Sequence, residues 1–168
     1  MSIDTLRRLG LFTVFLLAQV LVLGRIHLFQ CATPLLYVYF TVSFPRGTAK
    51  WSILLWNFFL GLLIDIFSNT PGMAAASLTA IAAIQPYYLE LFVPRDSSDD
   101  LQPALSTIGP MKYSYYVIPL VVLYCLFFYT LEMFSFANLL FWAVCVVSSS
   151  LLTLILIFAF EIARRHRS

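Results

Sequence analysis

Long apolar runs alternate with short polar connections along almost the whole chain, and this pattern predicts a bundle of membrane-spanning helices. A helix needs about 20 mainly apolar residues, within a range of roughly 17 to 25, to cross a bilayer. Six runs are candidates, at residues 9–28, 28–44, 51–67, 72–93, 113–131 and 136–160. The second run is the weakest, because Pro34 divides it and Pro34–Phe44 alone is too short to cross.

The composition indicates the same class of protein. The 168 residues are 61% hydrophobic and 11% charged, and their mean hydropathy is +0.91. A soluble domain of this length cannot bury so much apolar surface, so the excess must face lipid or a partner. The 16 Phe, nine Tyr and three Trp residues suit the aromatic belts found where bilayer meets water. We therefore expect an all-α polytopic membrane protein, with residues 1–168 forming a single transmembrane domain.

The basic residues decide the expected topology. With six spans and a cytoplasmic N-terminus, only Arg25 lies outside, and nine of the ten basic residues are cytoplasmic: Arg7, Arg8, Arg46, Lys50, Arg95, Lys112, Arg164, Arg165 and Arg167. If 28–44 did not cross, only Arg7 and Arg8 would stay inside. The positive-inside rule favours six spans, both termini in the cytoplasm and a solvated cytoplasmic loop at 94–112. No small-residue cleavage site follows the first run, so we expect it to be retained.

Candidate catalytic and metal-binding residues are scarce. The cysteines, Cys31, Cys125 and Cys145, form no CxxC or Cys/His pattern, so we interpret them as small buried residues. In the expected topology His27 and His166 lie at opposite membrane faces. The sequence has no P-loop, GxGxxG or GxSxG motif. We expect no enzymatic activity, no metal, no cofactor and no nucleic-acid partner.

The fourth run carries small residues at helical spacing. Gly72, Ala76 and Ala80 recur every four residues, a pattern that permits close helix packing in a membrane. This face is predicted to contact either its own bundle or another subunit, and the sequence does not choose between them. Pro86 should free one backbone carbonyl and kink the helix near Gln85.

Asp65 stands inside the third apolar run and has three interpretations. The first is a role in proton, ion or solute transport, the second is a polar contact with a partner, and the third is a structural joint between two helices. For the joint, Thr70 would be the N-cap of the next helix and Pro71 its first residue, so that the carboxylate reaches the exposed amides there. Arg25 is expected to pair with Asp65 or Glu132. We favour the joint, because a buried carboxylate at membrane depth needs a polar partner.

Three stretches, GLLIDIFSNTPGM, QPYYLELFVPRD and TLEMFSF, resemble the MreD family of rod shape-determining membrane proteins, in the form seen in Bacteroidetes-type bacteria. The resemblance covers nearly the whole chain. Its most distinctive part is the Asp-x-Phe-x-Asn-x-Pro-Gly element between the third and fourth runs. The family motifs carry over, as structural or partner-interface candidates, to Asp65, Phe67, Asn69, Pro71, Gly72, Pro86, Arg95, Asp96, Glu132 and Phe134.

The resemblance implies a multi-pass protein of the bacterial inner membrane without enzymatic activity. Such a protein binds the single-span protein MreC and belongs to the elongasome, which links MreB filaments to the RodA polymerase and its transpeptidase during lateral peptidoglycan synthesis. It also implies a six-helix fold similar to the substrate-binding subunits of energy-coupling-factor transporters. A homodimer is a further expectation.

Two other functions stay open at this point. A vitamin-binding transporter subunit is the main alternative, although the short predicted external connections offer little to cover a ligand. An enzyme acting on lipid-linked substrates would need two or more acids or histidines at one depth, and we cannot assemble such a set from the sequence.

Overall fold

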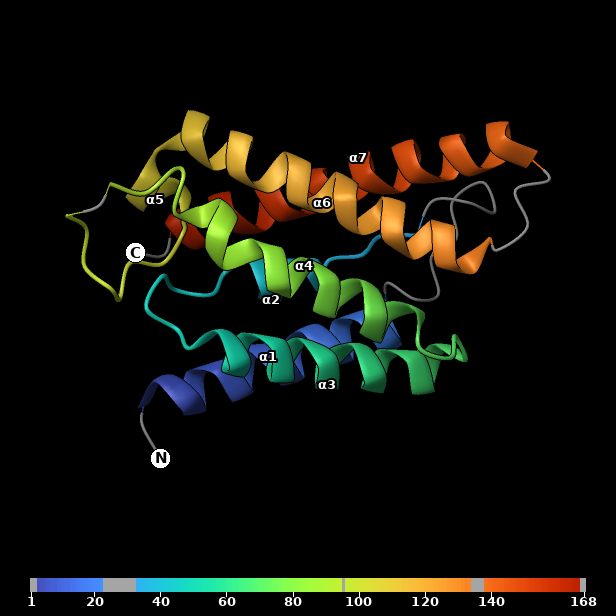
Figure 1. Ribbon diagram of the computed structural model, residues 1–168, viewed down its shortest axis with the longest axis horizontal. Helices are drawn as coiled ribbons and strands as arrows, with labels where there is room; N and C mark the ends of the chain where they lie inside the picture. The colour runs from blue at the N-terminus through green and yellow to red at the C-terminus, as the bar shows by residue number, and fades with distance from the viewer. Residues whose placement is uncertain (1–2, 23–32, 95, 134–137, 167–168) are drawn as a thin grey trace.

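The computed structural model describes residues 3–22, 33–94, 96–133 and 138–166, and the fold is all-α as expected. The described residues form seven helices (Figure 1): α1 (Ile3–Leu21), α2 (Val38–Val42), α3 (Lys50–Ser68), α4 (Met73–Leu89), α5 (Leu105–Ile108), α6 (Pro110–Glu132) and α7 (Leu139–Arg165). The five long helices lie side by side along the long axis of the molecule (Figure 1). Helices α1, α3 and α6 run away from the end that holds both termini, and α4 and α7 run back toward it.

Both termini lie at one end of the bundle, together with the connection between α2 and α3 and the connection between α4 and α5 (Figure 1). The turn between α3 and α4 lies at the opposite end. The predicted topology likewise places the two termini and those two connections on one side. Which side of a membrane this end occupies stays a prediction.

Three helices of the described residues, α3, α6 and α7, are long and apolar enough to cross a membrane. They correspond to the runs predicted at 51–67, 113–131 and 136–160. Helix α4 has 17 residues, or about 26 Å at roughly 1.5 Å per residue, and ends at Leu89 rather than at residue 93. Helix α1 begins at Ile3, before the predicted start at residue 9. The fold therefore fits a membrane protein, and the number of spans stays a prediction.

The second predicted helix is wrong over the part of 28–44 that is described. Residues 33–37 are not helical, and only Val38–Val42 form the short helix α2. This segment runs through the interior of the bundle, and Leu35, Tyr37 and the residues of α2 are almost completely buried. Irregular backbone is tolerated in apolar surroundings only where protein covers it and satisfies its polar groups.

Side chains from other helices bind the backbone of this interior segment. Two hydroxyls of α7 accept hydrogen bonds from backbone amides of the segment. One side chain of α6 and one of α4 donate hydrogen bonds to its backbone carbonyls. The bonds are Thr33 N to Ser149 Oγ at 3.2 Å, Leu35 N to Thr153 Oγ1 at 3.1 Å, Tyr116 Oη to Val42 O at 3.2 Å and Gln85 Nε2 to Phe44 O at 3.4 Å. These bonds replace the hydrogen bonds that a continuous helix would make within itself.

The predicted loop at 94–112 is partly helical and partly packed against the bundle. It contains α5, and α6 already begins at Pro110, where the missing proline N–H costs nothing. Arg46 N donates to Leu101 O at 3.3 Å and Gly47 N donates to Asp99 O at 2.7 Å. The loop is therefore docked on the connection between α2 and α3, and it is not simply a solvated linker.

Candidate functional site

The chain reverses direction between α3 and α4 within four residues. Asn69 caps α3 with a left-handed φ of 57°, and Gly72 precedes α4 with a φ of 80°. Asparagine and glycine tolerate this region best, asparagine because its short polar side chain bonds locally and glycine because it has no Cβ. The two residues thus set the sharp turn that the Asp-x-Phe-x-Asn-x-Pro-Gly element encodes.

The Asp65 carboxylate holds the two sides of this turn together, and only 3% of the residue is exposed. Its Oδ1 accepts the Thr70 hydroxyl at 2.8 Å and the Ala74 amide at 2.9 Å, while its Oδ2 accepts the Ala75 amide at 2.9 Å. Ala74 and Ala75 lie in the first turn of α4, where amides lack partners within the helix and the helix dipole favours negative charge. All three contacts are donors, which suits an ionised carboxylate.

The predicted contact between Asp65 and the start of the next helix is confirmed, but the predicted cap is wrong. Helix α4 begins at Met73 with Gly72 as its N-cap, so Thr70 and Pro71 both precede the helix. Thr70 instead turns its hydroxyl back to the carboxylate. The nine-residue separation between Asp65 and Ala74 lets one side chain do the work of a cap across the turn.

Helices α3 and α4 approach each other closely at Gly61. A Cβ added to Gly61 would lie 2.5 Å from the Cα of Ala75 and 2.6 Å from its nitrogen, which is closer than real Cβ contacts allow. Gly61 is buried at this crossing and Ala75 packs directly against it. This glycine therefore permits the approach that brings the Asp65 carboxylate to the first turn of α4.

The stripe predicted for helix packing, Gly72, Ala76 and Ala80, lies elsewhere. Gly72 and Ala76 are exposed and Ala80 is half-buried, and a Cβ added to Gly72 would meet nothing within 4 Å. The face that packs inside the bundle is the neighbouring one that contains Ala75. The sequence left open whether this stripe contacts its own bundle or another subunit. The described fold does not use the stripe as the packing face within its own bundle.

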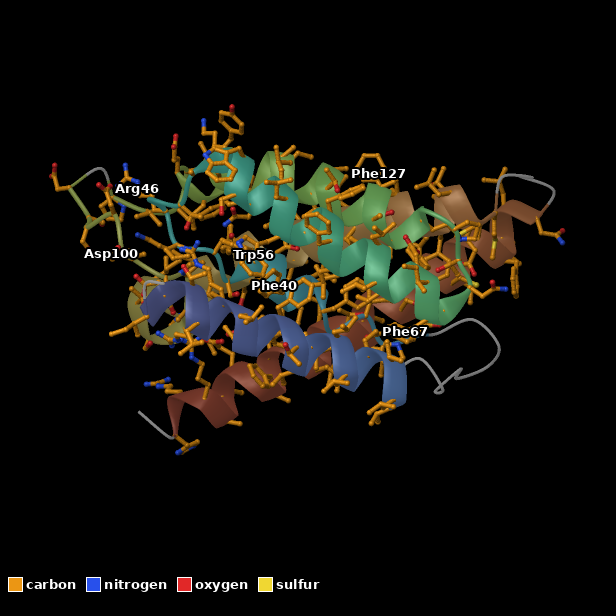
Figure 2. The ribbon with its side chains drawn as sticks, turned by 90° about the horizontal axis from the view of Figure 1, so that it is seen from below. Phe40, Arg46, Trp56, Phe67, Asp100 and Phe127 are labelled. Carbon is orange, nitrogen blue, oxygen red and sulfur yellow. The ribbon has the colours of Figure 1, made fainter. Side chains whose placement is uncertain are left out.

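The other predicted site residues are spread over the molecule. Phe67 is 62% exposed near the end of α3, and Figure 2 places it far from Arg46 and Asp100 at the other end. Pro86 is buried inside α4, which continues through it. Of the remaining candidates, those that are exposed are Asn69, Pro71, Asp96 and Glu132, and those that lie outside the described residues are Arg25, Arg95 and Phe134. Only the residues from Asp65 to Gly72 come together.

Sequence reasoning missed a second buried carboxylate, at Glu161 of α7. Its Oε2 accepts the Tyr39 hydroxyl at 2.5 Å and its Oε1 accepts the Leu105 amide at 3.3 Å. Arg164, one turn later, donates to the same Tyr39 hydroxyl at 3.1 Å. An acid and an arginine three positions apart at the end of an apolar helix were visible in the sequence, but their partner in the buried segment was not.

Further polar contacts inside the bundle join hydroxyl and amide groups. The Tyr37 and Tyr124 hydroxyls bond to each other, and Thr41 donates to Asn57 Oδ1 at 2.5 Å. Within residues 3–22, 33–94, 96–133 and 138–166, no group of three or more His, Cys, Asp or Glu side chains could hold a metal ion. The two hydroxyl contacts link the interior segment to α6 and α3.

Comparison with known proteins adds nothing to this geometry: no family model, curated protein or solved structure matches the chain.

Proposed function

We propose that the chain is a non-enzymatic membrane scaffold of the MreD type, which binds an MreC-like single-span protein and supports lateral peptidoglycan synthesis. The main support is the element that carries the resemblance, because its residues have identifiable structural tasks. Asp65 holds the first turn of α4, while Asn69 and Gly72 supply the positive φ angles of the turn. Both carboxylate oxygens of Asp65 are engaged by internal donors, so the group is poorly placed to bind a substrate.

The location follows from the same proposal. The chain would lie in the bacterial inner membrane as a six-span protein, with the end that holds both termini in the cytoplasm. The wider elongasome, with MreB, RodA and the transpeptidase, would reach it from both sides of the membrane. The segment at 33–44 would then count as a span that protein shields from lipid, in keeping with its burial.

The exposed stripe on α4 is the proposed contact for the partner's span. Lipid supplies no hydrophobic drive for helix association, so faces of small residues promote it by letting backbones approach closely. Gly72, Ala76 and Ala80 form such a face, and the described parts of the chain leave Gly72 and Ala76 exposed and cover Ala80 in part. A second copy packed on the same face would give the homodimer.

The test is a mild-detergent pull-down of the tagged protein from its native membrane, followed by mass spectrometry. We expect an MreC-like single-span protein at near-stoichiometric yield. Ala76→Leu should lower this yield about fivefold or more, since an overpacked contact costs at least about 1 kcal/mol.

The matched control for this variant is Ala143→Leu. Ala143 is exposed one turn after the start of α7, and Ala76 is one turn after the start of α4 at the same end of the bundle. The control should pull down the partner as the unchanged protein does. Equal losses in both variants would remove the stripe from the proposal. An ATPase module or a bound vitamin in place of the partner would overturn the scaffold and support the transporter alternative.

A further inference from the structure

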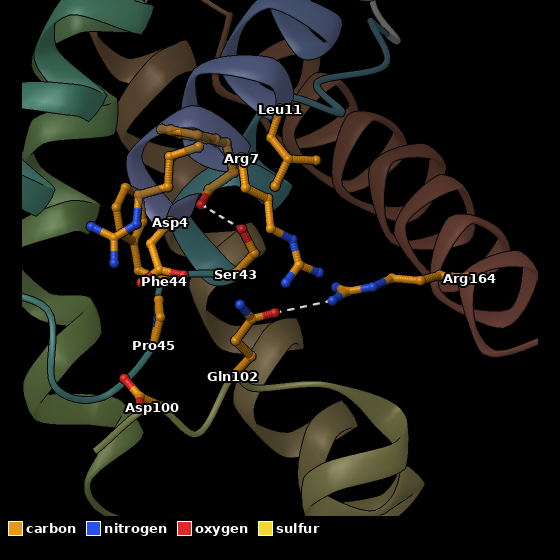
Figure 3. A pocket seen from close by; sticks show the side chains of 11 residues that line it. Asp4, Arg7, Leu11, Ser43, Phe44, Pro45, Asp100, Gln102 and Arg164 are labelled. Atoms are coloured by element: carbon orange, nitrogen blue, oxygen red, sulfur yellow. Dashed lines mark hydrogen bonds between the residues drawn. The ribbon is translucent and has the colours of Figure 1, made fainter. Parts of the chain in front are cut away.

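A polar cavity of about 270 Å³ opens at the end of the bundle that holds both termini. Four parts of the chain line it: the first turns of α1, the end of α2 with the turn that follows, the loop before α5, and the end of α7 (Figure 3). Its charged residues are three arginines and two aspartates: Arg7, Arg8, Arg164, Asp4 and Asp100. The arginines therefore outnumber the carboxylates in this open cavity, and Arg7 is exposed within it.

Two of these arginines face one another. Figure 3 shows the Arg7 and Arg164 side chains directed toward each other across the cavity, from α1 and α7. Among the described residues, the Arg7 side chain donates no hydrogen bond and forms no ion pair. Arg164 donates to two neutral acceptors, the Tyr39 hydroxyl at 3.1 Å and Gln102 Oε1 at 3.0 Å. Like charges held in this way repel, and an anion between them would reverse the sign of the interaction.

The carboxylates that line this cavity do not pair with the two arginines, and Glu161, which binds the same Tyr39 hydroxyl as Arg164, does not line it. Asp4 and Asp100 form no ion pair with the arginines in the described parts of the chain, and they lie on the side of Phe44 and Pro45 (Figure 3). The Arg8 side chain already has two partners. It donates to Thr48 Oγ1 at 3.1 Å, and its guanidinium carbon lies 5.5 Å from the centre of the Phe44 ring. The donors that remain in the cavity belong mainly to Arg7, with a guanidinium offering five N–H groups.

We propose that this cavity binds the phosphate group of an anionic phospholipid. Guanidinium forks match phosphate oxygens in geometry and charge. A lipid is favoured over a soluble phosphate because exposed apolar side chains stand beside Arg7 on the same helix, with Ile3 86% and Leu6 60% exposed, and these can lie against acyl chains. The proposal concerns a lipid site and does not depend on the scaffold function.

The decisive variant is Arg7→Gln in the full-length protein, purified in mild detergent. Removing the Arg7 guanidinium breaks no hydrogen bond in the described structure, so the fold should be unchanged. The control is Arg165→Gln, which removes a guanidinium from an exposed position beside Arg164 that does not line this cavity. Binding of phosphatidylglycerol, phosphatidylcholine, inorganic phosphate and glycerol 3-phosphate is measured by native mass spectrometry and by the shift in thermal stability.

The unchanged protein and Arg165→Gln should bind phosphatidylglycerol more tightly than phosphatidylcholine. Arg7→Gln should bind it on the order of tenfold more weakly, as expected for the loss of a hydrogen-bonding charged group. Arg7→Lys, which keeps the charge but not the fork, should fall between the two. The proposal is overturned if Arg7→Gln binds phosphatidylglycerol as tightly as the unchanged protein, if phosphatidylcholine binds equally well, or if the soluble phosphates compete at the affinity of the lipid.

Discussion

The joint between α3 and α4 makes the strongest quantitative prediction, through the substitution Asp65→Asn. The amide oxygen of asparagine can still accept one set of the donors that the carboxylate binds. The NH₂ group replaces the other oxygen and faces an N–H or O–H group, from which it can accept nothing. The change keeps the size and shape of the side chain, so its effect reports on the hydrogen bonds and the charge rather than on packing.

The magnitude follows from the three bonds at 2.8, 2.9 and 2.9 Å. At least one hydrogen bond to a charged group is lost, which costs roughly 1.5–3 kcal/mol. The favourable charge at the start of α4 is also lost, for about 0.3–1 kcal/mol more. Burying an amide is less costly than burying a carboxylate, and this offsets part of the loss. We expect the free energy of unfolding to fall by about 2 kcal/mol.

The assay is unfolding in mixed micelles of mild detergent and sodium dodecyl sulfate, followed by circular dichroism. Thr70→Val should cost about 1 kcal/mol, because it removes one of the three donors and leaves the two amides in place. An Asp65→Asn protein as stable as the unchanged one would refute the joint as the role of this carboxylate. If that stable variant also lost its partner in the pull-down, Asp65 would be a partner contact instead.

Two further predictions concern packing and the second buried carboxylate. Gly61→Ala should force α3 and α4 apart, because the added Cβ would lie 2.5 Å from Ala75 Cα. It should lower the free energy of unfolding by about 1–3 kcal/mol in the same assay. The control is Gly10→Ala, which should not destabilise the protein because its Cβ meets nothing within 4 Å. Glu161→Gln should lower the free energy of unfolding by about 1–3 kcal/mol, because the glutamine side chain cannot accept hydrogen bonds from both the Tyr39 hydroxyl and the Leu105 backbone amide. An unchanged unfolding midpoint would show that these two bonds contribute nothing.

The joint could be predicted from the sequence because all its parts are local. Asp65 and its farthest partner, Ala75, are ten positions apart, so the turn alone brings them together. The exact cap was wrong, since Thr70 and Pro71 suit a helix start but Gly72 can adopt the left-handed φ that the reversal needs. Local propensity thus located the turn but not the residue at which α4 begins.

The packing face of α4 and the course of the second run depend on distant residues. Ala75 and Ala76 are neighbours of similar size on α4, yet only Ala75 is buried, because it packs against Gly61 of α3. The position of Pro34 indicated that the second run, 28–44, was not an ordinary helix. Its path, however, depends on Ser149 and Thr153, whose partners lie 116 and 118 positions earlier in the chain. No periodicity reveals such pairs.

A common physical role connects three polar side chains that the apolar helices contain. Asp65 accepts amides of α4, Thr153 accepts the amide of Leu35, and Glu161 accepts the amide of Leu105. In each case the amide lies at a helix start or in irregular backbone, where it has no partner in its own helix. A transport pathway needs polar groups with free capacity for a passing solute, whereas the main acceptors of these three are engaged by backbone. Their use favours a rigid bundle and hence the scaffold.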